Sequence, residues 1–333
     1  MNMKKDVVLL LGASGQVGTE TLARLQGTWQ VIAPRSSELD LTDLDATRRM
    51  IRSTKPRWIV NAAAYTAVDR AESEPDTAFL LNAEAVRIMG EEARALGAAV
   101  IHFSTDYVFD GTARAPRQEN DATGPLGVYG SSKLAGERAL ADTMAAHFIF
   151  RTSWVYSTHG KNFLLTILKL ARERAELSIV ADQIGAPTSA RTLAELTQHA
   201  MLRSEAMARD EALSLPAAVE RIGGLYHASN SGETSWYGFA MEFIELARSM
   251  EMEAVVRGSR ASHAPHFAKL KPITTAEYPT PAKRPLDSRM ECTRLSEKLG
   301  FTMPSWKKAL RETMEELVRE PQYRTTEALA GRD

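Results

Sequence analysis

A tyrosine and a lysine lie four residues apart, at Tyr129 and Lys133. On a helix, this spacing places the two side chains on one face, a turn apart. A tyrosine hydroxyl has an ordinary pKa of about 10 and is a poor acid or base at neutral pH. A nearby ammonium stabilises the phenolate and lowers that pKa. The pair therefore predicts acid–base chemistry at the start of a helix, with Tyr129 as the group that moves the proton.

A second polar stretch, Ser104-Thr105-Asp106-Tyr107, ends the predicted strand before that helix. A hydroxyl at this point can hydrogen-bond a carbonyl oxygen held by Tyr129. Serine, threonine and aspartate at such positions also cap turns and loops, and alone they favour that interpretation. In chain order with the tyrosine–lysine pair, they favour catalysis.

Three glycines at Gly12, Gly15 and Gly18 follow the first predicted strand and open the first helix. This spacing suits a dinucleotide-binding turn, in which glycines allow a tight turn and a close approach to pyrophosphate. The pyrophosphate then lies at the helix N-terminus, beside Gln16 and Val17. The alternative is a glycine turn that only packs.

Three further stretches bear on the cofactor. Arg35 follows the second strand, where a 2′-phosphate would lie, and this favours NADPH over NADH. A solvent-facing arginine is the alternative. Asp40 and Leu41 either touch the adenine or belong to the cap of the next helix, which is the commoner use of Asp-Leu-Thr-Asp. Small residues after the third strand let a cofactor lie against the backbone: Ala62, Ala63 and Ala64.

Apolar runs alternate with amphipathic ones through the first half of the chain. This pattern predicts an α/β fold with a Rossmann-type, doubly wound parallel sheet and a smaller C-terminal α/β substrate-binding domain. The predicted strands cover 6–11, 29–33, 58–61, 99–103 and 148–151, and the helices 16–25, 44–53, 76–96, 129–145, 163–173, 192–202, 237–250 and 307–319. Residues 1–152 are predicted to form the dinucleotide-binding domain, with strands near 177–181 and 225–228 returning to it. Residues 153–333 are predicted to be mostly the substrate-binding domain.

Composition excludes several other classes of protein. The 333 residues carry 41 Lys and Arg against 42 Asp and Glu, so nucleic-acid binding as the main role is not expected. The single cysteine, Cys292, excludes an internal disulfide and fits a reducing compartment. No apolar run reaches the roughly 18 residues of a membrane span. We expect a soluble, cytoplasmic protein without a membrane partner.

The ordered motifs resemble the extended short-chain dehydrogenase/reductase superfamily and, within it, the dTDP-4-dehydrorhamnose reductases. The segment 204–221 looks longer than the family pattern and is interpreted as a surface insertion. The resemblance extends through most of the chain and rests on residues 12–18, 60–69, 104–109, 129–137, 151–156, 182–188 and 278–285.

This resemblance implies NADPH-dependent reduction of the 4-keto group of dTDP-4-dehydro-L-rhamnose to dTDP-L-rhamnose, a precursor of cell-surface polysaccharide. Tyr129 would donate the proton, Lys133 would hold the nicotinamide ribose and tune Tyr129, and Thr105 would orient the ketone. The resemblance places five residues near the substrate, namely Tyr107 and Trp154 by the sugar and Asn162, Gln183 and Arg284 by the nucleotide. For Trp154, a core or hinge role is an equal alternative.

The resemblance also allows Mg²⁺ at a subunit contact, and hence a homodimer, but assigns no ligands. His263 and His266 are interpreted as loop histidines.

Two other functions compete with the reductase. A dehydratase or epimerase acting on another nucleotide sugar shares the fold, but Tyr107 occupies the position where a dehydratase of this superfamily has glutamate. A non-catalytic dinucleotide-binding regulatory subunit is the alternative of a different class. It would tolerate loss of Thr105, Tyr129 and Lys133, all of which are present.

Overall fold

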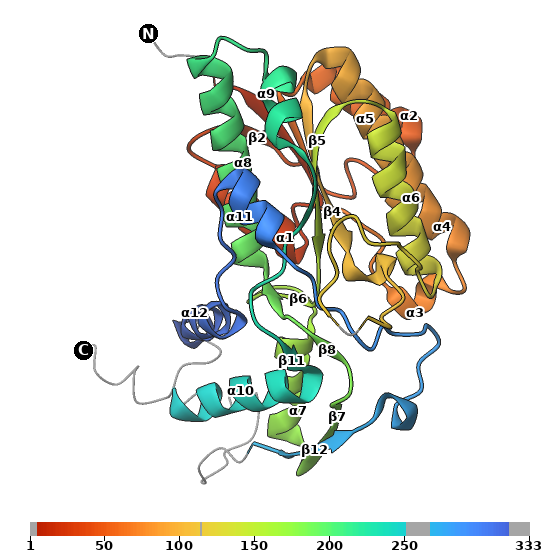
Figure 1. The fold of residues 1–333 in the computed structure, drawn as a ribbon, viewed down its shortest axis with the longest axis vertical. Coiled ribbons are helices and arrows are strands. Elements are labelled where there is room, and N and C mark those ends of the chain that lie inside the picture. The colour runs from red at the N-terminus through yellow and green to blue at the C-terminus, as the bar shows by residue number, and fades with distance from the viewer. Residues whose placement is uncertain (1–4, 114, 251–266, 320–333) are drawn as a thin grey trace, which may run out of the picture.

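The fold centres on a parallel sheet of six strands (Figure 1). The computed structural model describes residues 5–113, 115–250 and 267–319. The sheet has the order β10-β5-β4-β3-β1-β2, so the chain adds β2 on one side of β1 and the later strands on the other. This order confirms the predicted doubly wound α/β class. The strands are β1 (Val7–Leu11), β2 (Gln30–Ile32), β3 (Trp58–Asn61), β4 (Ala99–Thr105), β5 (Ala146–Thr152) and β10 (Gly224–His227).

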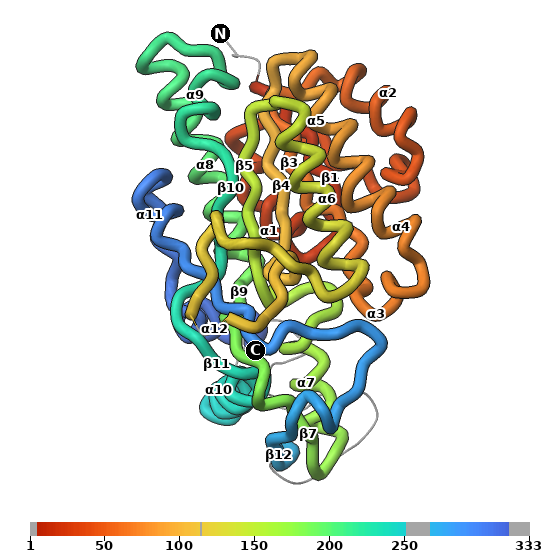
Figure 2. Tube along the Cα trace, turned by 45° about the vertical axis from the view of Figure 1, so that its right-hand side comes forward, coloured from red at the N-terminus to blue at the C-terminus, as the bar shows by residue number. Residues whose placement is uncertain are grey.

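Helices cover both faces of this sheet (Figures 1 and 2). Side chains of a strand alternate between faces, so Val8 and Leu10 enter one core cluster while Leu9 and Leu11 enter another. Burial on both faces explains why the strands are mainly apolar. The first cluster is closed by α1 (Gln16–Leu25), α8 (Ala190–Asp210) and α9 (Leu215–Ile222), and the second by α2 (Leu44–Thr54), α5 (Ala85–Leu96) and α6 (Val128–Asp142).

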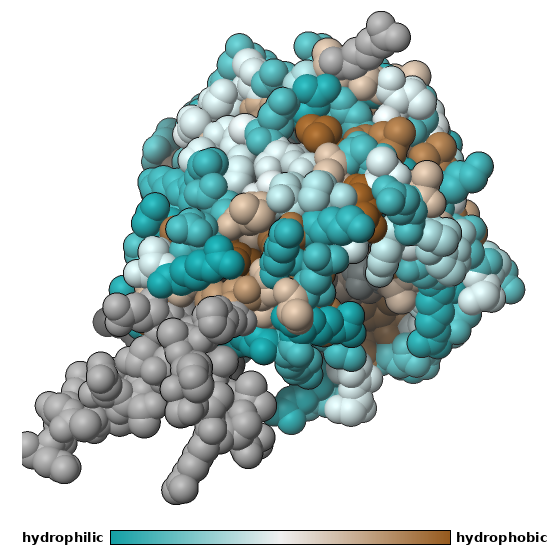
Figure 3. Space-filling view, turned by 90° about the horizontal axis from the view of Figure 1, so that it is seen from below, coloured by the Kyte–Doolittle hydropathy of each residue, from teal (hydrophilic) through white to brown (hydrophobic). Residues whose placement is uncertain are grey.

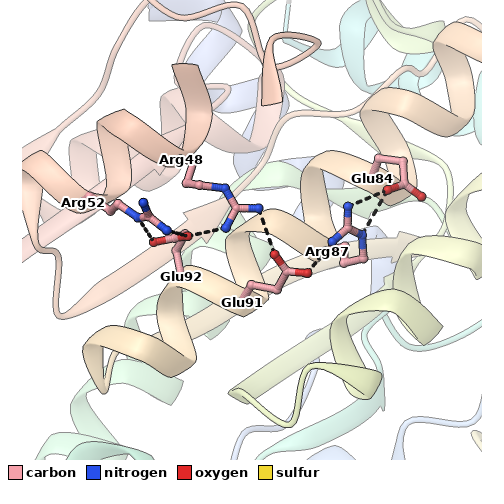
Figure 4. A network of polar contacts seen from close by, with 6 residues as sticks. All are labelled: Arg48, Arg52, Glu84, Arg87, Glu91 and Glu92. Carbon is pink, nitrogen blue, oxygen red and sulfur yellow. Dashed lines mark hydrogen bonds and ion pairs between the residues drawn. The ribbon is translucent and has the colours of Figure 1, made fainter. Parts of the chain in front are cut away.

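A row of ion pairs joins α2 to α5 on the outer surface (Figure 4). Arg48 and Arg52 both contact Glu92, at 2.5 and 2.7 Å. The Glu92 side chain is only 4% exposed, and two guanidinium groups compensate the burial of its charge. Further pairs extend the row along η1 and α5 through Glu84, Arg87 and Glu91.

A smaller region follows the carboxyl ends of the large sheet's strands and lies below the sheet in Figure 1. It has its own apolar core, to which Tyr156, Phe239 and Leu310 belong. Three two-stranded sheets and three helices build it, together with the 3-10 turn η3 (Thr275–Glu277): β6 (Val155–Tyr156) with β9 (Thr188–Ser189), β8 (Ile184–Gly185) with β11 (Thr234–Ser235), β7 (Glu176–Val180) with β12 (Lys269–Ile273), and α7 (Phe163–Glu173), α10 (Trp236–Ser249) and α12 (Trp306–Arg319).

The single long helix predicted over 76–96 is interrupted. It consists of α4 (Pro75–Phe79), a π-helical turn η1 (Leu80–Glu84) and α5. The π turn directs buried Asn82 towards α6, where its amide donates to Ser132 Oγ at 3.0 Å. A Cβ on Gly136 would lie 2.0 Å from the Asn82 carbonyl oxygen, so α6 packs closely against the turn. Tertiary packing therefore sets this irregularity.

One predicted strand lies in a different sheet from the one expected. Residues 225–228 overlap β10, which pairs in parallel with β5 in the large sheet. Residues 177–181 overlap β7, which instead pairs with β12 in the smaller region. The reason is packing, because Leu177 and Ile179 enter the core of the smaller region.

The interpretation of 204–221 as a surface insertion is wrong. Leu215, Ala218, Val219 and Ile222 lie on one face of α9, at helical spacing, and at most 6% of each is exposed. This face packs into the core beneath β5 and β10. Elements after residue 153, namely α8, α9 and β10, thus belong to the large sheet and its covering layer.

Seen from below, the surface is mainly hydrophilic with scattered apolar residues (Figure 3). Within the described part of the chain, no helix combines the length and the hydropathy needed to cross a membrane.

Candidate active site

A cavity of about 610 Å³ opens at the carboxyl ends of β1, β3 and β4. The chain reverses its direction of strand addition between β1 and β3, and ligands of open α/β sheets bind at such a switch point. Many of the residues predicted to contact cofactor line this cavity: Gly12, Gly15, Gln16, Val17, Asp40, Leu41, Ala62, Ala63, Ala64, Tyr129 and Lys133.

The glycine turn is shaped by contacts that a side chain would prevent. Gly12 has a φ of 78°, and a Cβ there would lie 2.5 Å from the Ala63 nitrogen. A Cβ on Gly18 would lie 2.0 Å from the Gly12 carbonyl oxygen, which explains why Gly18 packs behind the turn and does not line the cavity. Gly15 is the N-cap of α1 without a side-chain cap, so backbone N–H groups face the cavity. This cradle fits a pyrophosphate.

Residues 40–43 were predicted either to touch the adenine or to cap the next helix, and Asp40 and Asp43 differ in this respect. Asp43, not Asp40, caps α2, by accepting a hydrogen bond from the Ala46 N–H at 2.8 Å. Asp40 accepts from the Thr42 hydroxyl at 2.7 Å and from the Thr42 N–H, and these bonds lower the pKa of its carboxyl. Asp40 and Leu41 line the cavity, where an adenosine would lie.

Arg35 lies at the rim of the cavity. Its neighbours Pro34 and Ser36 line the cavity, whereas the Arg35 residue is exposed and is not among the lining residues. Its backbone N–H donates to Glu38 Oε2 at 2.7 Å. Its role towards a 2′-phosphate stays a prediction.

Tyr129 and Lys133 lie on the first turns of α6, against the end of β4. Burial raises the pKa of Tyr129 to about 12, with Asp106 acting in the same direction and Thr105 opposing both. Lys133 is 2% exposed, and its Nζ donates to the Phe103 carbonyl oxygen at 2.6 Å. Burial lowers the pKa of Lys133 to about 8. The three predicted catalytic residues are thus brought together.

Two neighbours complete this group. The Tyr107 ring meets the Tyr129 ring edge-on, with 5.4 Å between centroids. Asp106 is buried, and burial raises its pKa to about 6, opposed by nearby Ser288 and by a hydrogen bond from Thr105. Asp106 was not among the predicted catalytic residues, although its place directly after Thr105 is a signal that could have found it.

Trp154 and Gln183 lie together in the smaller region. The Trp154 ring stacks on Trp236 at 3.8 Å between centroids, and Trp236 Nε1 donates to Gln183 Oε1 at 3.1 Å. Trp154 has a φ of 48°, a strained conformation that packing must support. Trp236 was not among the predicted site residues, because only tertiary contact brings it to Trp154.

The other two predicted substrate residues lie elsewhere. Arg284 is paired with Asp69, on the short helix α3 (Val68–Ala71), at 2.8 Å. Both charges influence the pKa of Tyr107, so this pair lies near the catalytic group. Asn162 is the N-cap of α7, and its Nδ2 donates to Gln16 Oε1 at 2.9 Å, which places it beside the glycine turn. The five residues therefore do not form one cluster.

One group of metal-ligand types occurs among the described residues. Ligand atoms of Glu20, His159 and Glu316 lie within 4.8 Å of one another. Glu316 also pairs with Arg191, whose charge competes with that of a cation. His263 and His266 lie outside the described residues.

The glycine cradle at the switch point and the Thr105–Tyr129–Lys133 group beside it define a dinucleotide-binding protein of the short-chain dehydrogenase/reductase class. Residues 5–319 match the protein family described as the RmlD substrate binding domain. Two relatives named dTDP-4-dehydrorhamnose reductase are each 42% identical to this chain. The relative from Burkholderia thailandensis covers 91% of this chain and 96% of its own length, and the one from Escherichia coli K12 covers 93% and 97%.

Solved structures agree with these relatives. A dTDP-4-dehydrorhamnose reductase of Clostridium acetobutylicum is 33% identical, with a TM-score of 0.80, and covers 93% of this chain and 99% of its own. The enzyme of the same name from Bacillus anthracis, solved in complex with NADP, is 31% identical, with a TM-score of 0.80, and covers 94% and 99%. This chain belongs to the dTDP-4-dehydrorhamnose reductase family.

Proposed function

We propose that this protein reduces the 4-keto group of dTDP-4-dehydro-L-rhamnose to give dTDP-L-rhamnose, with NADPH as the reductant. One observation carries the proposal: Tyr129, with Thr105 beside it, lines the same cavity as the glycine cradle. A proton donor is thereby available beside the place for a hydride donor. The names of relatives at 42% identity support the substrate.

The chain's own residues manage the proton. Bound NADPH supplies a hydride to the carbonyl carbon. Thr105 orients the ketone, and Tyr129 gives its hydroxyl proton to the carbonyl oxygen as the carbon is reduced. Because the pKa of Tyr129 is about 12, the phenol is protonated at neutral pH and ready to donate. Solvent then returns a proton to Tyr129, and the ketone has gained one hydride and one proton.

The cofactor would lie along the cavity with its pyrophosphate at Gly12 and Gly15. Asp40 and Leu41 lie where the adenosine would end, and Lys133 lies where the nicotinamide ribose would lie. We favour NADPH over NADH because Arg35, at the rim, supplies a cation for a 2′-phosphate. The Bacillus anthracis relative was solved with NADP, which supports this preference.

The nucleotide sugar would enter between the large sheet and the smaller region. Tyr107, in contact with Tyr129, would border the sugar, and Trp154 with Gln183 would border it from the smaller region. Arg284 would exchange Asp69 for a phosphate oxygen, which suits its planar fork of donors. A Mg²⁺ ion remains a secondary proposal, for which Glu20 and Glu316 offer carboxylate ligands.

A single assay tests the proposal. Purified protein is mixed with NADPH and enzymatically prepared dTDP-4-dehydro-L-rhamnose, and the loss of reduced-nicotinamide absorbance is followed. We expect oxidation that requires the sugar. If NADPH binds but no 4-keto nucleotide sugar is reduced, the proposal is wrong and the regulatory-subunit interpretation replaces it. A parallel reaction with Tyr237→Phe, a tyrosine on α10 that does not line the cavity, controls for changes in protein quality.

A further inference from the structure

A loop of the smaller region lies against the glycine turn of the large sheet. Residues 157–162 connect β6 to α7, and Gly160 and Lys161 of this loop line the cavity. Gly160 has a φ of 72°, in the left-handed region that favours glycine, and a Cβ there would lie 3.5 Å from Gln16 Cγ. The loop thus brings a lysine to the glycine cradle, and the reaction described above gives that lysine no task.

Two side-chain amides hold this loop in place. Asn162 Oδ1 accepts from the Leu165 N–H at 3.0 Å, so the Asn162 NH₂ group faces the other way. That group donates to the Ser157 carbonyl oxygen at 3.0 Å and to Gln16 Oε1 at 2.9 Å. The Gln16 NH₂ group then lies 3.5 Å from the Val155 carbonyl oxygen. The Gln16 side chain is therefore committed to the smaller region, whereas its backbone N–H, at the start of α1, remains for a ligand.

The charged residues that line the cavity are spread along it. They are Asp40, Lys133 and Lys161. Asp40 lies where the adenosine would end and supplies no positive charge. Lys133 belongs to the catalytic group, where its Nζ donates to the Phe103 carbonyl oxygen at 2.6 Å. Among the described lining residues, Lys161 is therefore the cation that the loop holds beside the glycine cradle.

No carboxylate in the described part of the chain pairs with the Lys161 ammonium. The acidic groups beside the loop, Glu20 and Glu316, gather around His159, and Glu316 is also paired with Arg191. A cradle of backbone N–H groups at a helix N-terminus already favours an anion. An unpaired ammonium beside it favours an anion of higher charge, and a diphosphate carries two negative charges.

We propose that Lys161 is a cofactor-binding residue: held beside the glycine cradle by the contact between Gln16 and Asn162, its ammonium binds a phosphate oxygen of the cofactor's diphosphate. The inference rests on the proposed function, because it takes the ligand of the cavity to be a nicotinamide dinucleotide. The diphosphate then contacts the large sheet through N–H groups and the smaller region through Lys161. Cofactor binding thereby strengthens the contact between the two regions.

The lysine is tested first, by fluorescence titrations of NADPH and of NADH. We expect Lys161→Met to raise the Kd of both by about tenfold, because both carry the diphosphate. Lys161→Arg, which keeps the cation, should restore most of the affinity. Lys169→Met, at an exposed lysine of α7 in the same region, is the matched control and should leave both Kd values unchanged.

Three results of these titrations overturn the proposal. The first is a Kd for NADH that Lys161→Met does not change. The second is an equal loss of affinity in Lys169→Met, which would indicate general attraction of an anion. The third is a loss confined to NADPH, which would assign Lys161 to the 2′-phosphate that NADH lacks.

The nucleotide sugar also carries a diphosphate, so its contact with Lys161 is tested separately. Isothermal titration calorimetry with dTDP measures binding of that diphosphate without the cofactor. We expect Lys161→Met to leave the Kd of dTDP unchanged. A weaker dTDP complex with unchanged NADH affinity would assign the lysine to the sugar nucleotide and overturn the proposal.

The role of the contact between Gln16 and Asn162 is tested by a double-mutant cycle. Gln16→Met removes the side-chain amide and keeps the backbone N–H that faces the cavity. We expect this variant to weaken NADH binding, and the double variant with Lys161→Met to bind NADH about as weakly as Lys161→Met alone. Fully additive losses would mean that Gln16 does not position Lys161, and would overturn the proposal.

All these titrations measure binding and need no turnover. Absence of reduction of the nucleotide sugar, with the expected losses of NADPH and NADH affinity, would overturn the proposed function and leave this inference in place. Normal turnover in the original protein, with unchanged cofactor affinity in Lys161→Met, would overturn this inference alone.

Discussion

At the scale of single residues, burial is the force that prepares the site. Lys133 and Asp106 are buried and Tyr129 is partly buried, and burial shifts each pKa towards the neutral form. A neutral phenol beside a cofactor cavity can give a proton to a ketone.

The first prediction concerns the proton donor. Tyr129→Phe removes the hydroxyl and keeps the ring that contacts Tyr107. We expect kcat to fall by about 10²- to 10⁴-fold, the usual range for one acid–base group, with NADPH affinity retained. Steady-state kinetics and a fluorescence titration of NADPH measure the two quantities. A kcat near that of the Tyr237→Phe control would exclude Tyr129 as the donor.

The second prediction concerns Asp106. Its pKa in the folded protein is about 6, above the ordinary value of about 3.9. The folded state therefore binds more protons between these values, and the stability present below about pH 4 is lost as the pH rises through about 6. We therefore compare the free energy of unfolding of Asp106→Asn with that of the original protein. We expect this difference to change in favour of the variant by about 2–3 kcal/mol between pH 4 and pH 7.5.

Urea unfolding at the two pH values measures this difference. Asp110→Asn is the control, because hydrogen bonds from Thr112 lower the pKa of Asp110 and its pH dependence has the opposite sign. An identical effect of Asp106→Asn at both pH values would contradict the prediction.

The third prediction concerns cofactor choice. Arg35→Asp places a carboxylate at the cavity rim, where it repels a 2′-phosphate and can accept from a ribose hydroxyl. We expect the ratio of kcat/KM for NADPH to that for NADH to fall by about tenfold or more. Parallel assays with both cofactors measure it, and an unchanged ratio would remove Arg35 from the cofactor site.

At the scale of elements, the turn between β1 and α1 needs glycine at two positions for two different reasons. A Cβ on Gly18 would collide with the Gly12 carbonyl oxygen at 2.0 Å, inside the fold. A Cβ on Gly15 would meet only that same oxygen, at 3.3 Å, and would project at the helix N-terminus that faces the cavity. Glycine is therefore needed at position 18 for packing and at position 15 for access of the ligand to the helix N-terminus.

These two glycines give the fourth prediction. Gly18→Ala should lower the free energy of unfolding by about 1–3 kcal/mol, because the helix must move away from the turn. Gly15→Ala should leave stability nearly unchanged and weaken NADPH binding by about tenfold or more. Thermal unfolding and a cofactor titration on both variants measure these effects. Equal losses of stability in the two variants would contradict the assignment of Gly18 to packing and Gly15 to ligand binding.

At the scale of the whole molecule, the site is assembled from segments far apart in sequence. Asn162 of the smaller region donates to Gln16 of the glycine turn, and Arg284 pairs with Asp69 across 215 residues. The late segment carrying Arg284 runs beside α3 (Figure 2). The two regions therefore meet around the cavity.

The fifth prediction follows from the contact between the two regions around the cavity. Arg284→Ala should lower kcat/KM for the nucleotide sugar by about 10- to 100-fold, the effect of losing one charge-assisted contact to phosphate, with little change in KM for NADPH. Lys283→Ala, at the exposed neighbouring position, is the matched control. Equal effects of the two variants would indicate general attraction of the anion, without a specific clamp.

Much of the fold was predictable because local patterns carry it. The helix at Gln16–Leu25, the strand at Trp58–Asn61 and the helix at Phe163–Glu173 have the predicted bounds. Helix 76–96 and segment 204–221 were misjudged, since a π turn and a buried helix face depend on what packs against them. Local pattern likewise does not decide which sheet a strand such as β7 joins.

The sequence by itself determined the chemical types and their order along the chain: a glycine turn, then Thr105, Tyr129 and Lys133. These follow from spacing and from the rule that parallel strands end at one edge. Tertiary structure decided what surrounds each group. It placed Trp236 on Trp154, Asp69 on Arg284 and His102 between Asn61 and Lys133. Burial and long-range contact set the charge of each group, and neither is a property of a residue's neighbours in sequence.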